Sequence, residues 1–372
     1  MIYLNLPYYR SQSPLSNSRR RIRAWCPLWS RTADGSHGRG ASNSEHAPKS
    51  GSPATMMRRL ILDALSATVQ RLLPTRALSN LAFTLTRIRV AAIKNAMIRG
   101  FSHLYAIDRS EAACADLSGY RDFNAFFTRA LKDGARPLPD DPTVVVSPVD
   151  GTISQCAAID DGRLIQAKGR DYSVLELLGG DAELAACLGR GSFCTIYLAP
   201  GDYHRIHAPL DGRLVSWSYI PGRLFSVNPA TARAMPRLFA RNERLFAHFD
   251  TIAGPLVLVM VGALFVGSLE TVWAGRVSPP HRRRGGVTRH TPSAPLACAR
   301  GAELGRFNMG STVILLAGAD RLRWHAGCVA GSPLRMGQPL ARVTGAATTP
   351  ARPSSSSSAR SSSVSPDSCV WR

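Results

Sequence analysis

From about residue 143 onward, the chain consists of short runs of β-forming residues separated by glycine and proline. The runs are Thr143–Val146, Gly151–Ser154, Ser192–Leu198, Gly212–Ile220, Arg244–Phe249 and Thr312–Leu316. Only Val174–Leu178 and Thr231–Phe239 have a helical pattern in this part of the chain. Short strands at such close spacing are typical of antiparallel sheets. We therefore predict an α+β fold with a mostly antiparallel β body and N-terminal amphipathic helices.

An uncharged stretch of 19 residues, Thr251–Leu269, is close to the length of a membrane span. It also contains Gly254, Pro255, Gly262 and Gly267, and it is rich in valine. Glycine and proline commonly punctuate short strands. We therefore predict two buried strands joined near Gly262 rather than a helix that crosses a bilayer.

The segment before the β body has the periodicity of amphipathic helices. In RRLILDALSATVQRLL, which begins at Arg58, apolar residues recur at helical spacing until Pro74 interrupts the pattern. A second segment, residues 81–101, mixes apolar residues with basic ones, namely Arg87, Arg89, Lys94 and Arg99. Such helices lie in anionic lipid interfaces, although an ordinary helix packed on the body would have the same pattern. We interpret residues 58–115 as a basic, helical, membrane-associating region.

The distribution of charge excludes one function class. The net charge is +21. The excess positive charge is confined to residues 1–57, 58–104, 276–300 and 349–372, and the rest of the chain is neutral overall. A nucleic-acid-binding body would carry its positive charge on the folded part. We therefore expect no nucleic-acid partner.

Both ends of the chain have low-complexity composition. We interpret residues 1–57 as a disordered extension and residues 348–372 as a serine-rich disordered tail, on either side of a β-rich domain at 116–347. Translation from Met56 or Met57 would make the extension non-native. The eight cysteines include no C-x-x-C pair, and the N-terminus lacks a signal-peptide pattern, so we expect a reduced compartment.

Two histidines three residues apart, His204 and His207, lie in the segment YHRIH. On a helix this spacing would suit a metal ion, but Pro200, Gly201 and Pro209 make a helix improbable, and no third ligand follows. We therefore expect no metal. A position between a strand and a turn suits a general acid or base, whereas a structural histidine pair is the alternative.

Asp150 and Ser311 are the other candidates for chemistry. Asp150 precedes Gly151 after a run of valines, which by itself is typical of a turn. An aspartate there could also orient a histidine, as in a Ser-His-Asp set. Ser311 follows Gly310 at the start of an apolar run, where glycine permits a tight bend. No G-x-S-x-G elbow surrounds Ser311, and the chain has neither a G-x-G-x-x-G fingerprint nor a P-loop.

Together these segments resemble the proteobacterial type of phosphatidylserine decarboxylase, a pyruvoyl enzyme made as a proenzyme. The resemblance runs from about residue 58 to 345. It includes YRDFNAFFTRALKDGARPL (120–138), SPVDGTISQ (147–155), QAKGRDYSVLELL (166–178), YLAPGDYHRIHAP (197–209), PGRLFSVNP (221–229), LFARNER (238–244), VGSLETVWAG (266–275) and GRFNMGSTV (305–313). The family's cleavage motif ends in Gly-Ser-Thr, here Gly310-Ser311-Thr312. Residues 1–57 and the serine-rich tail depart from the family's pattern.

The resemblance implies that the chain cleaves itself between Gly310 and Ser311. Ser311 Oγ would attack the Gly310 carbonyl, and elimination would then leave a large chain, residues 1–310, and a small chain, residues 311–372. Ser311 would become a pyruvoyl group, the enzyme's cofactor, at the N-terminus of the small chain. Its ketone would form a Schiff base with phosphatidylserine and accept the electrons left by CO2, giving phosphatidylethanolamine.

The resemblance also implies roles for the other candidates. By family match, His207 is the base that activates Ser311, and Asp150 orients His207. His204 would assist decarboxylation or protonate the product. The alternative function is a serine hydrolase that uses Ser311, His207 and Asp150 on external substrates. Such an enzyme would remain a single chain.

The substrate and the basic helices together imply a location. We expect peripheral attachment to an anionic membrane surface, on the cytoplasmic side of the bacterial inner membrane, where phosphatidylserine is available in the bilayer. Family resemblance further implies that the large and small chains stay together and that two processed protomers form a homodimer.

Overall fold

In the computed structural model, the described residues are 68–345 without Lys168, 266–267 and 279–285, together with Met57, Asp63 and Leu65. All of them belong to a single unit within residues 52–372. The predicted disordered extension and serine-rich tail lie outside the described residues, apart from Met57, which is helical and exposed. Those two predictions therefore stay predictions.

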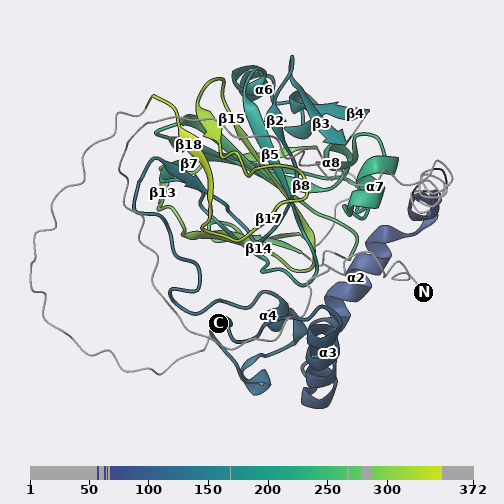
Figure 1. Cartoon of the computed structure of the whole chain (residues 1–372). Coiled ribbons are helices and arrows are strands. Elements are labelled where there is room, and N and C mark those ends of the chain that lie inside the picture. Colours follow the sequence, from purple (N-terminus) through teal and green to yellow (C-terminus); the bar gives the residue numbers. More distant parts are fainter. Residues whose placement is uncertain are drawn as a thin grey trace, which may run out of the picture. The chain divides into compact units, whose positions relative to one another are not determined.

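The body of the protein is built from antiparallel sheets (Figure 1). Within the described residues, the largest sheet has the strand order β12-β7-β8-β9-β15-β5-β2-β17, and β13 also pairs with β7. Its strands are β2 (Gly151–Ala158), β5 (Ser192–Leu198), β7 (Gly212–Ile220), β8 (Arg244–Thr251), β9 (Gly254–Val261), β12 (Thr288–His290), β13 (Leu296–Cys298), β15 (Ser311–Ala317) and β17 (Pro333–Leu334). The predicted β runs are all strands, and the α+β prediction is confirmed.

Smaller sheets complete the body. One has the order β11-β10-β14-β6, another β1-β18-β16, and the third is the β3-β4 hairpin. Their strands are β1 (Val144–Val146), β3 (Arg163–Ala167), β4 (Arg170–Ser173), β6 (Arg205–His207), β10 (Leu269–Thr271), β11 (Gly275–Ser278), β14 (Glu303–Phe307), β16 (Leu322–Trp324) and β18 (Pro339–Val343). Every pairing between these strands is antiparallel.

The helices differ from the prediction in several places. They are α2 (Thr75–Leu85), α3 (Ala91–Leu104), the 3-10 helix η1 (Leu117–Gly119), α4 (Phe123–Phe127), α5 (Val174–Leu177), α6 (Ala182–Leu188), α7 (Pro229–Ala234) and α8 (Leu238–Arg241). The prediction missed α6, which Asp181 caps by accepting a hydrogen bond from Leu184 N. The helix predicted over 231–239 is two helices, because Met235 is extended before Pro236.

In its described residues, the uncharged stretch contains one buried strand and no helix, so the prediction of two strands joined near Gly262 was wrong in its second strand. β9 occupies residues 254–261, pairs with β8 and β15 on its two sides, and is almost entirely buried from Leu256 to Val261. The stretch ends where β10 begins at Leu269. Within the described part of the chain, no helix has both the length and the hydrophobicity needed to cross a bilayer.

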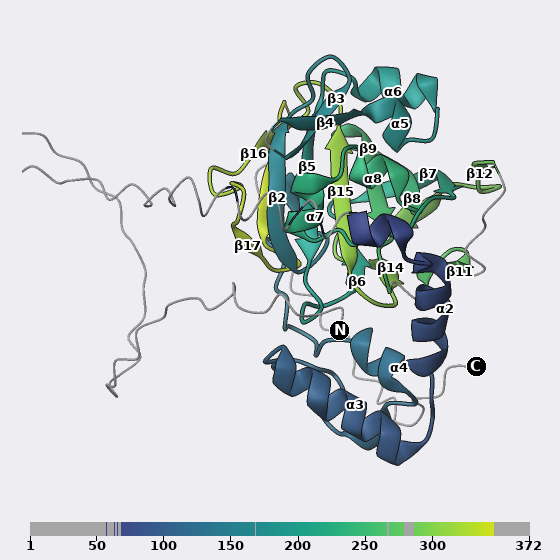
Figure 2. The ribbon, with the colours of Figure 1, turned by 90° about the vertical axis from the view of Figure 1, so that its right-hand side faces the viewer.

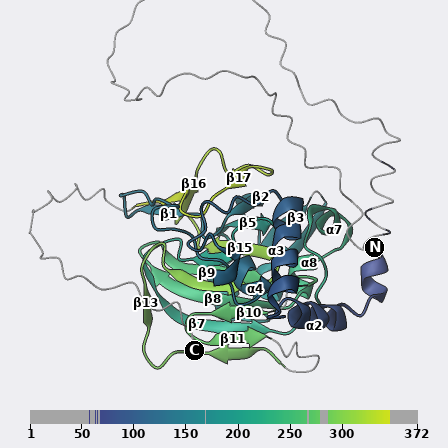
Figure 3. The same cartoon turned by 90° about the horizontal axis from the view of Figure 1, so that it is seen from below.

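The N-terminal helices lie at one end of the body, with α4 between α3 and the sheets (Figure 2). Viewed from that end, α3 and α4 lie in front of the strands (Figure 3). The predicted segment 81–101 is divided between α2 and α3, because residues 86–90 are not helical. The backbone N–H of Asn124 in α4 donates to the Thr86 carbonyl in this break, at 2.9 Å.

One basic residue of these helices was misplaced by the sequence analysis. Lys94 is buried, and its Nζ donates to the carbonyls of Leu117 and Tyr120 at 2.6 and 2.7 Å. A lysine held by two backbone carbonyls is unable to face lipid, so its assignment to the membrane-facing set was wrong. Arg87 is half-buried, with its guanidinium 3.6 Å from the centre of the Phe83 ring. Only Arg89 and Arg99 of the four predicted basic residues are exposed.

Candidate active site

Two connections between sheets bring the predicted nucleophile and the histidines together. β5 leads into β6 through residues 199–204, and β14 leads into β15 through residues 308–310. Ser311 lies opposite Leu198 in the β15–β5 pairing. At the other end of the two connections, Phe307 N donates to the His204 carbonyl at 3.1 Å. The two segments therefore run side by side.

The bond between Gly310 and Ser311 lies in unusual surroundings. Ser311 is completely buried, and its Oγ has no hydrogen-bond partner among the described residues. A buried hydroxyl without a partner is unfavourable and often marks a functional position. A Cβ added to Gly310 would meet nothing within 4 Å, so there is open space on the side of Gly310 where a side chain would project.

The backbone just before this bond is strained. Met309 has a φ of 102°, which residues with a side chain rarely adopt. The preceding residue, Asn308, is anchored from several directions. Its Oδ1 accepts from Asn124 Nδ2 at 2.7 Å, and its Nδ2 donates to Glu270 Oε1 at 3.0 Å and to Ser268 Oγ. Met309 is thus constrained between the anchored Asn308 and the start of β15.

His204 has one ring nitrogen available for chemistry. Nδ1 lies 2.7 Å from the Asp202 carbonyl, which only accepts, so Nδ1 carries the proton. Nε2 is then a bare acceptor, and it is buried with no partner among the described residues. Burial lowers the pKa of His204 to about 3, so the ring is neutral at pH 7. The Phe127 ring packs against it, 4.2 Å away between ring centres.

His207 has both ring nitrogens engaged. Nδ1 donates to the Gly301 carbonyl at 2.7 Å, and Nε2 accepts from the hydroxyl of Tyr203 at 2.8 Å. Burial lowers the pKa of His207 as well. Neither ring nitrogen of His207 is hydrogen-bonded to Ser311 or Asp150 in this arrangement, and the predicted roles of these residues stay predictions. Tyr203 is a site residue that the sequence analysis quoted in its motif without assigning it a role.

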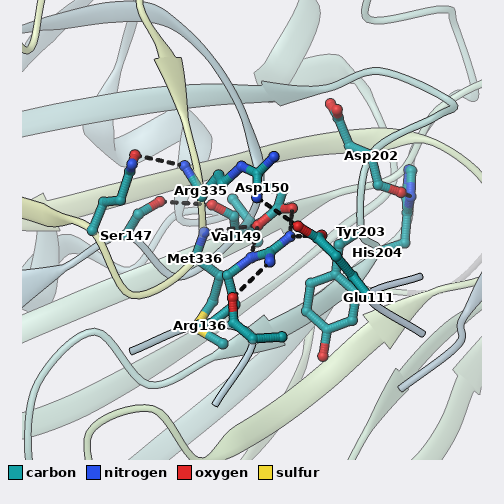
Figure 4. A network of polar contacts seen from close by, with 12 residues as sticks. Glu111, Arg136, Ser147, Val149, Asp150, Asp202, Tyr203, His204, Arg335 and Met336 are labelled. Carbon is teal, nitrogen blue, oxygen red and sulfur yellow. Dashed lines mark hydrogen bonds and ion pairs between the residues drawn. The ribbon is translucent and has the colours of Figure 1, made fainter. Parts of the chain in front are cut away.

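Asp150 lies near His207 but contacts other groups. The His207 backbone N–H donates to the Pro148 carbonyl at 2.9 Å, which places the 148–150 turn beside the histidine. The Asp150 carboxylate instead accepts from Arg136 and from Met336 N (Figure 4). It acts on His207 as a nearby negative charge, which works against the lowering of the His207 pKa by burial.

The described residues offer no obvious metal site. No three His, Cys, Asp or Glu side chains in this part of the chain gather as a metal ion would need. The titratable groups on the segment beside Ser311 include the two histidines, whose pKa values burial lowers, and Asp202, whose pKa burial raises to about 6. Such a set suits proton transfer around a serine hydroxyl.

Comparison with known proteins identifies the family. Residues 123–342, more than half of the chain, match the family model described as phosphatidylserine decarboxylase. The chain belongs to the phosphatidylserine decarboxylase family. A second model, described as PSD, matches residues 65–106. Asp150, His204 and Ser311 all lie within the range matched to phosphatidylserine decarboxylase.

Curated relatives agree with this membership in the phosphatidylserine decarboxylase family. The chain is 54% identical over 272 residues to a phosphatidylserine decarboxylase proenzyme of Pseudomonas fluorescens, covering 73% of this chain and 94% of that protein. It is 51% identical over 281 residues to the proenzyme of that name in Pseudomonas aeruginosa, covering 75% and 97%. It is 48% identical over 290 residues to that of Nitrosococcus oceani, covering 78% and 95%.

Proposed function

We propose that the chain is a proenzyme that cleaves itself between Gly310 and Ser311 and then decarboxylates phosphatidylserine to phosphatidylethanolamine. The main structural support is the state of Ser311. Its hydroxyl is buried and, within the described residues, unpartnered, with an uncrowded glycine before it and a strained Met309 before that. Family membership and the proenzyme names of the relatives support the same function.

The proposed self-cleavage at the Gly310–Ser311 peptide bond takes three steps. Ser311 Oγ attacks the Gly310 carbonyl carbon, the C–N bond breaks, and the peptide becomes an ester. Removal of the Ser311 α-proton then breaks the Cβ–O bond, which leaves a carboxylate on Gly310 and dehydroalanine at position 311. Water converts the dehydroalanine into a pyruvoyl group and ammonia. The absence of a side chain at Gly310, and the open space where one would project, would ease a rearrangement of the peptide during the attack.

After cleavage, the pyruvoyl group would stand in place of Ser311 at the start of β15, where the neighbouring strands would hold it. Its environment there is the beginning of an interior strand of the largest sheet, opposite Leu198 and beside the segment that carries His204. When present, the group supplies an electron-accepting carbonyl for the loss of CO2. We propose that His204 moves a proton in this step, because its Nε2 is neutral, buried and unpartnered among the described residues.

We propose His207 as the base for self-cleavage, on the basis of its match to the family motif. The hydrogen bond from Tyr203 to His207 Nε2 occupies the nitrogen that would accept the Ser311 proton. Before His207 takes the Ser311 proton, the Tyr203 hydroxyl has to turn away or pass a proton along. His204 is the competing base, since its acceptor nitrogen is already open.

A purified full-length chain tests the proposal directly. We expect two bands on a denaturing gel, because residues 311–372 are one sixth of the 40.1 kDa chain, or about 6.7 kDa. The small chain should resist Edman sequencing until its ketone is reductively aminated. The sample should also release CO2 from phosphatidylserine in detergent. Activity in a preparation that contains only uncleaved protein would refute the pyruvoyl mechanism.

We propose that the protein attaches peripherally to an anionic membrane through α2 and α3, on the cytoplasmic side of the bacterial inner membrane. These helices and the turn between them expose large apolar side chains, namely Leu81, Leu85, Val90, Ile93 and Leu104. Arg89 and Arg99 are exposed on the same two-helix region. Apolar insertion and attraction to anionic lipid would therefore act together.

The charge contribution can be measured with a double variant, Arg89→Gln with Arg99→Gln. Each basic group near an anionic surface contributes about 1 kcal/mol, so vesicle affinity should fall by about 30-fold. Binding to neutral vesicles should not change. The matched control is Arg163→Gln with Arg190→Gln, two exposed arginines elsewhere on the body, which should bind as wild type does. Equal binding of both double variants to anionic vesicles would contradict electrostatic attachment by this segment.

A further inference from the structure

The carboxylate of Asp150 is held by a buried arginine. Arg136 Nε lies 3.2 Å from Oδ1, and Arg136 Nη2 lies 2.6 Å from Oδ2. The Arg136 side chain is only 6% exposed and that of Asp150 12%. Paired contacts of this kind fix a carboxylate in orientation as well as in position.

A second acidic residue fixes the arginine in turn. Glu111 Oε2 lies 2.9 Å from Arg136 Nη2, and Glu111 Oε1 lies 2.7 Å from Arg335 Nη1. Figure 4 shows Arg136 between the two carboxylates. The four side chains thus form a continuous row in which the charges alternate.

This row spans the proposed cleavage point. Arg335 and Met336 belong to residues 311–372, whereas Glu111, Arg136 and Asp150 precede the cut. Met336 N donates to Asp150 Oδ1 at 2.7 Å. Asp150 is therefore held by groups from both sides of the Gly310–Ser311 bond.

The backbone around Asp150 has its own supports. Ser147 N donates to the Gln338 carbonyl at 2.8 Å, and Gly337 N donates to the Ser147 carbonyl at 3.0 Å. His207 N is bonded to the Pro148 carbonyl in the same turn. Loss of Arg136 should thus leave the turn in place, but the Asp150 carboxylate would be buried without its cation and held, among the described residues, only by Met336 N.

We propose that Arg136 is a positioning residue for self-cleavage, which holds the Asp150 carboxylate beside His207 while Glu111 holds Arg136. This inference rests on the proposed self-cleavage and on the proposed role of Asp150. Arg136 would affect the rate of cleavage only through Asp150. Glu111 would affect that rate less, because it acts only through Arg136.

The test is the rate at which freshly synthesised full-length chain becomes two chains, followed on gels over days. Arg136→Gln should slow cleavage about tenfold or more, because the buried carboxylate loses its partner. Arg136→Lys keeps the charge without the paired geometry, so its rate should fall between those of Arg136→Gln and wild type. Glu111→Gln should slow cleavage less than Arg136→Gln.

A double-variant cycle separates positioning from a general loss of structure. If Arg136 acts through Asp150, Arg136→Gln should have little further effect in an Asp150→Asn background. An effect of full size in that background would overturn the proposal, as would wild-type cleavage by Arg136→Gln. If Arg136→Gln does not fold, the cleavage rate of Arg136→Lys tests the proposal instead. Cleavage of Arg136→Lys at the wild-type rate would overturn it.

Two controls complete the design. Arg163→Gln breaks an exposed arginine–aspartate pair, with Asp171, and should cleave at the wild-type rate. Wild-type chain must itself cleave and release CO2 from phosphatidylserine. An intact, inactive wild-type chain would refute the proposed function, whereas normal cleavage by both wild type and Arg136→Gln would refute only the role of Arg136.

Discussion

Ser311→Ala is expected to remain a single chain of about 40 kDa and to have no decarboxylase activity. Alanine lacks the oxygen that is proposed to attack the Gly310 carbonyl, so neither the ester nor the pyruvoyl group should form. The substitution removes a buried hydroxyl that has no partner among the described residues, so stability should be retained or slightly increased. Gel analysis, intact mass and CO2 release measure the three outcomes.

The matched control is a serine that is equally buried but remote in sequence. Ser218 lies in β7 and is 2% exposed, so Ser218→Ala tests whether loss of a buried hydroxyl alone prevents maturation. It should cleave as wild type does. Decarboxylation by uncleaved Ser311→Ala would show that the electron sink is not made from this residue.

His207→Ala is expected to block self-cleavage, whereas His204→Ala should still cleave, at least partly, yet decarboxylate poorly. Loss of a general base typically slows a reaction by about 10² to 10⁴-fold. The structure makes this comparison informative, because the acceptor nitrogen of His207 is occupied by Tyr203 and that of His204 is open. Each variant is assayed twice, by the rate of chain cleavage and by CO2 release per cleaved chain.

A pH series adds a second readout to the same pair. Burial lowers the pKa of both histidines below the ordinary value of about 6.5. A base has to be neutral, so wild-type cleavage should stay near its maximum as the pH falls through 6.5 and should decline only in more acidic solution. Rapid cleavage by His207→Ala together with none by His204→Ala would make His204 the base instead.

Most of the β body could be predicted because its signals are local. Ser192–Leu198 is a strand with β-branched and aromatic residues between glycines and prolines, and Thr312–Leu316 is similar. The helix α6 was missed because it is short, although Asp181 before it and Gly189 after it are typical helix caps. The division of 231–239 was visible in Pro236, which the periodicity argument did not weigh.

The candidate site was predictable in its members and not in its contacts. Ser311 and the two histidines come from motifs, and the fold brings their segments together. That His207 bonds to Tyr203 and Asp150 to Arg136 depends on how loops from distant strands pack, which periodicity does not encode. The burial of Lys94 is a similar case, since a lysine in an amphipathic helix ordinarily faces water.

The location of β15 has a consequence for how the protein would behave after the proposed cleavage. Ser311 to Ala317 pair with β5 on one side, and Thr312 to Ala317 pair with β9 on the other. If the chain is cut at Gly310–Ser311 as proposed, unfolding would release two chains, and recovery of the folded protein would then depend on their concentration. The lifetime of the cut protein would in that case depend on how slowly β15 leaves the sheet.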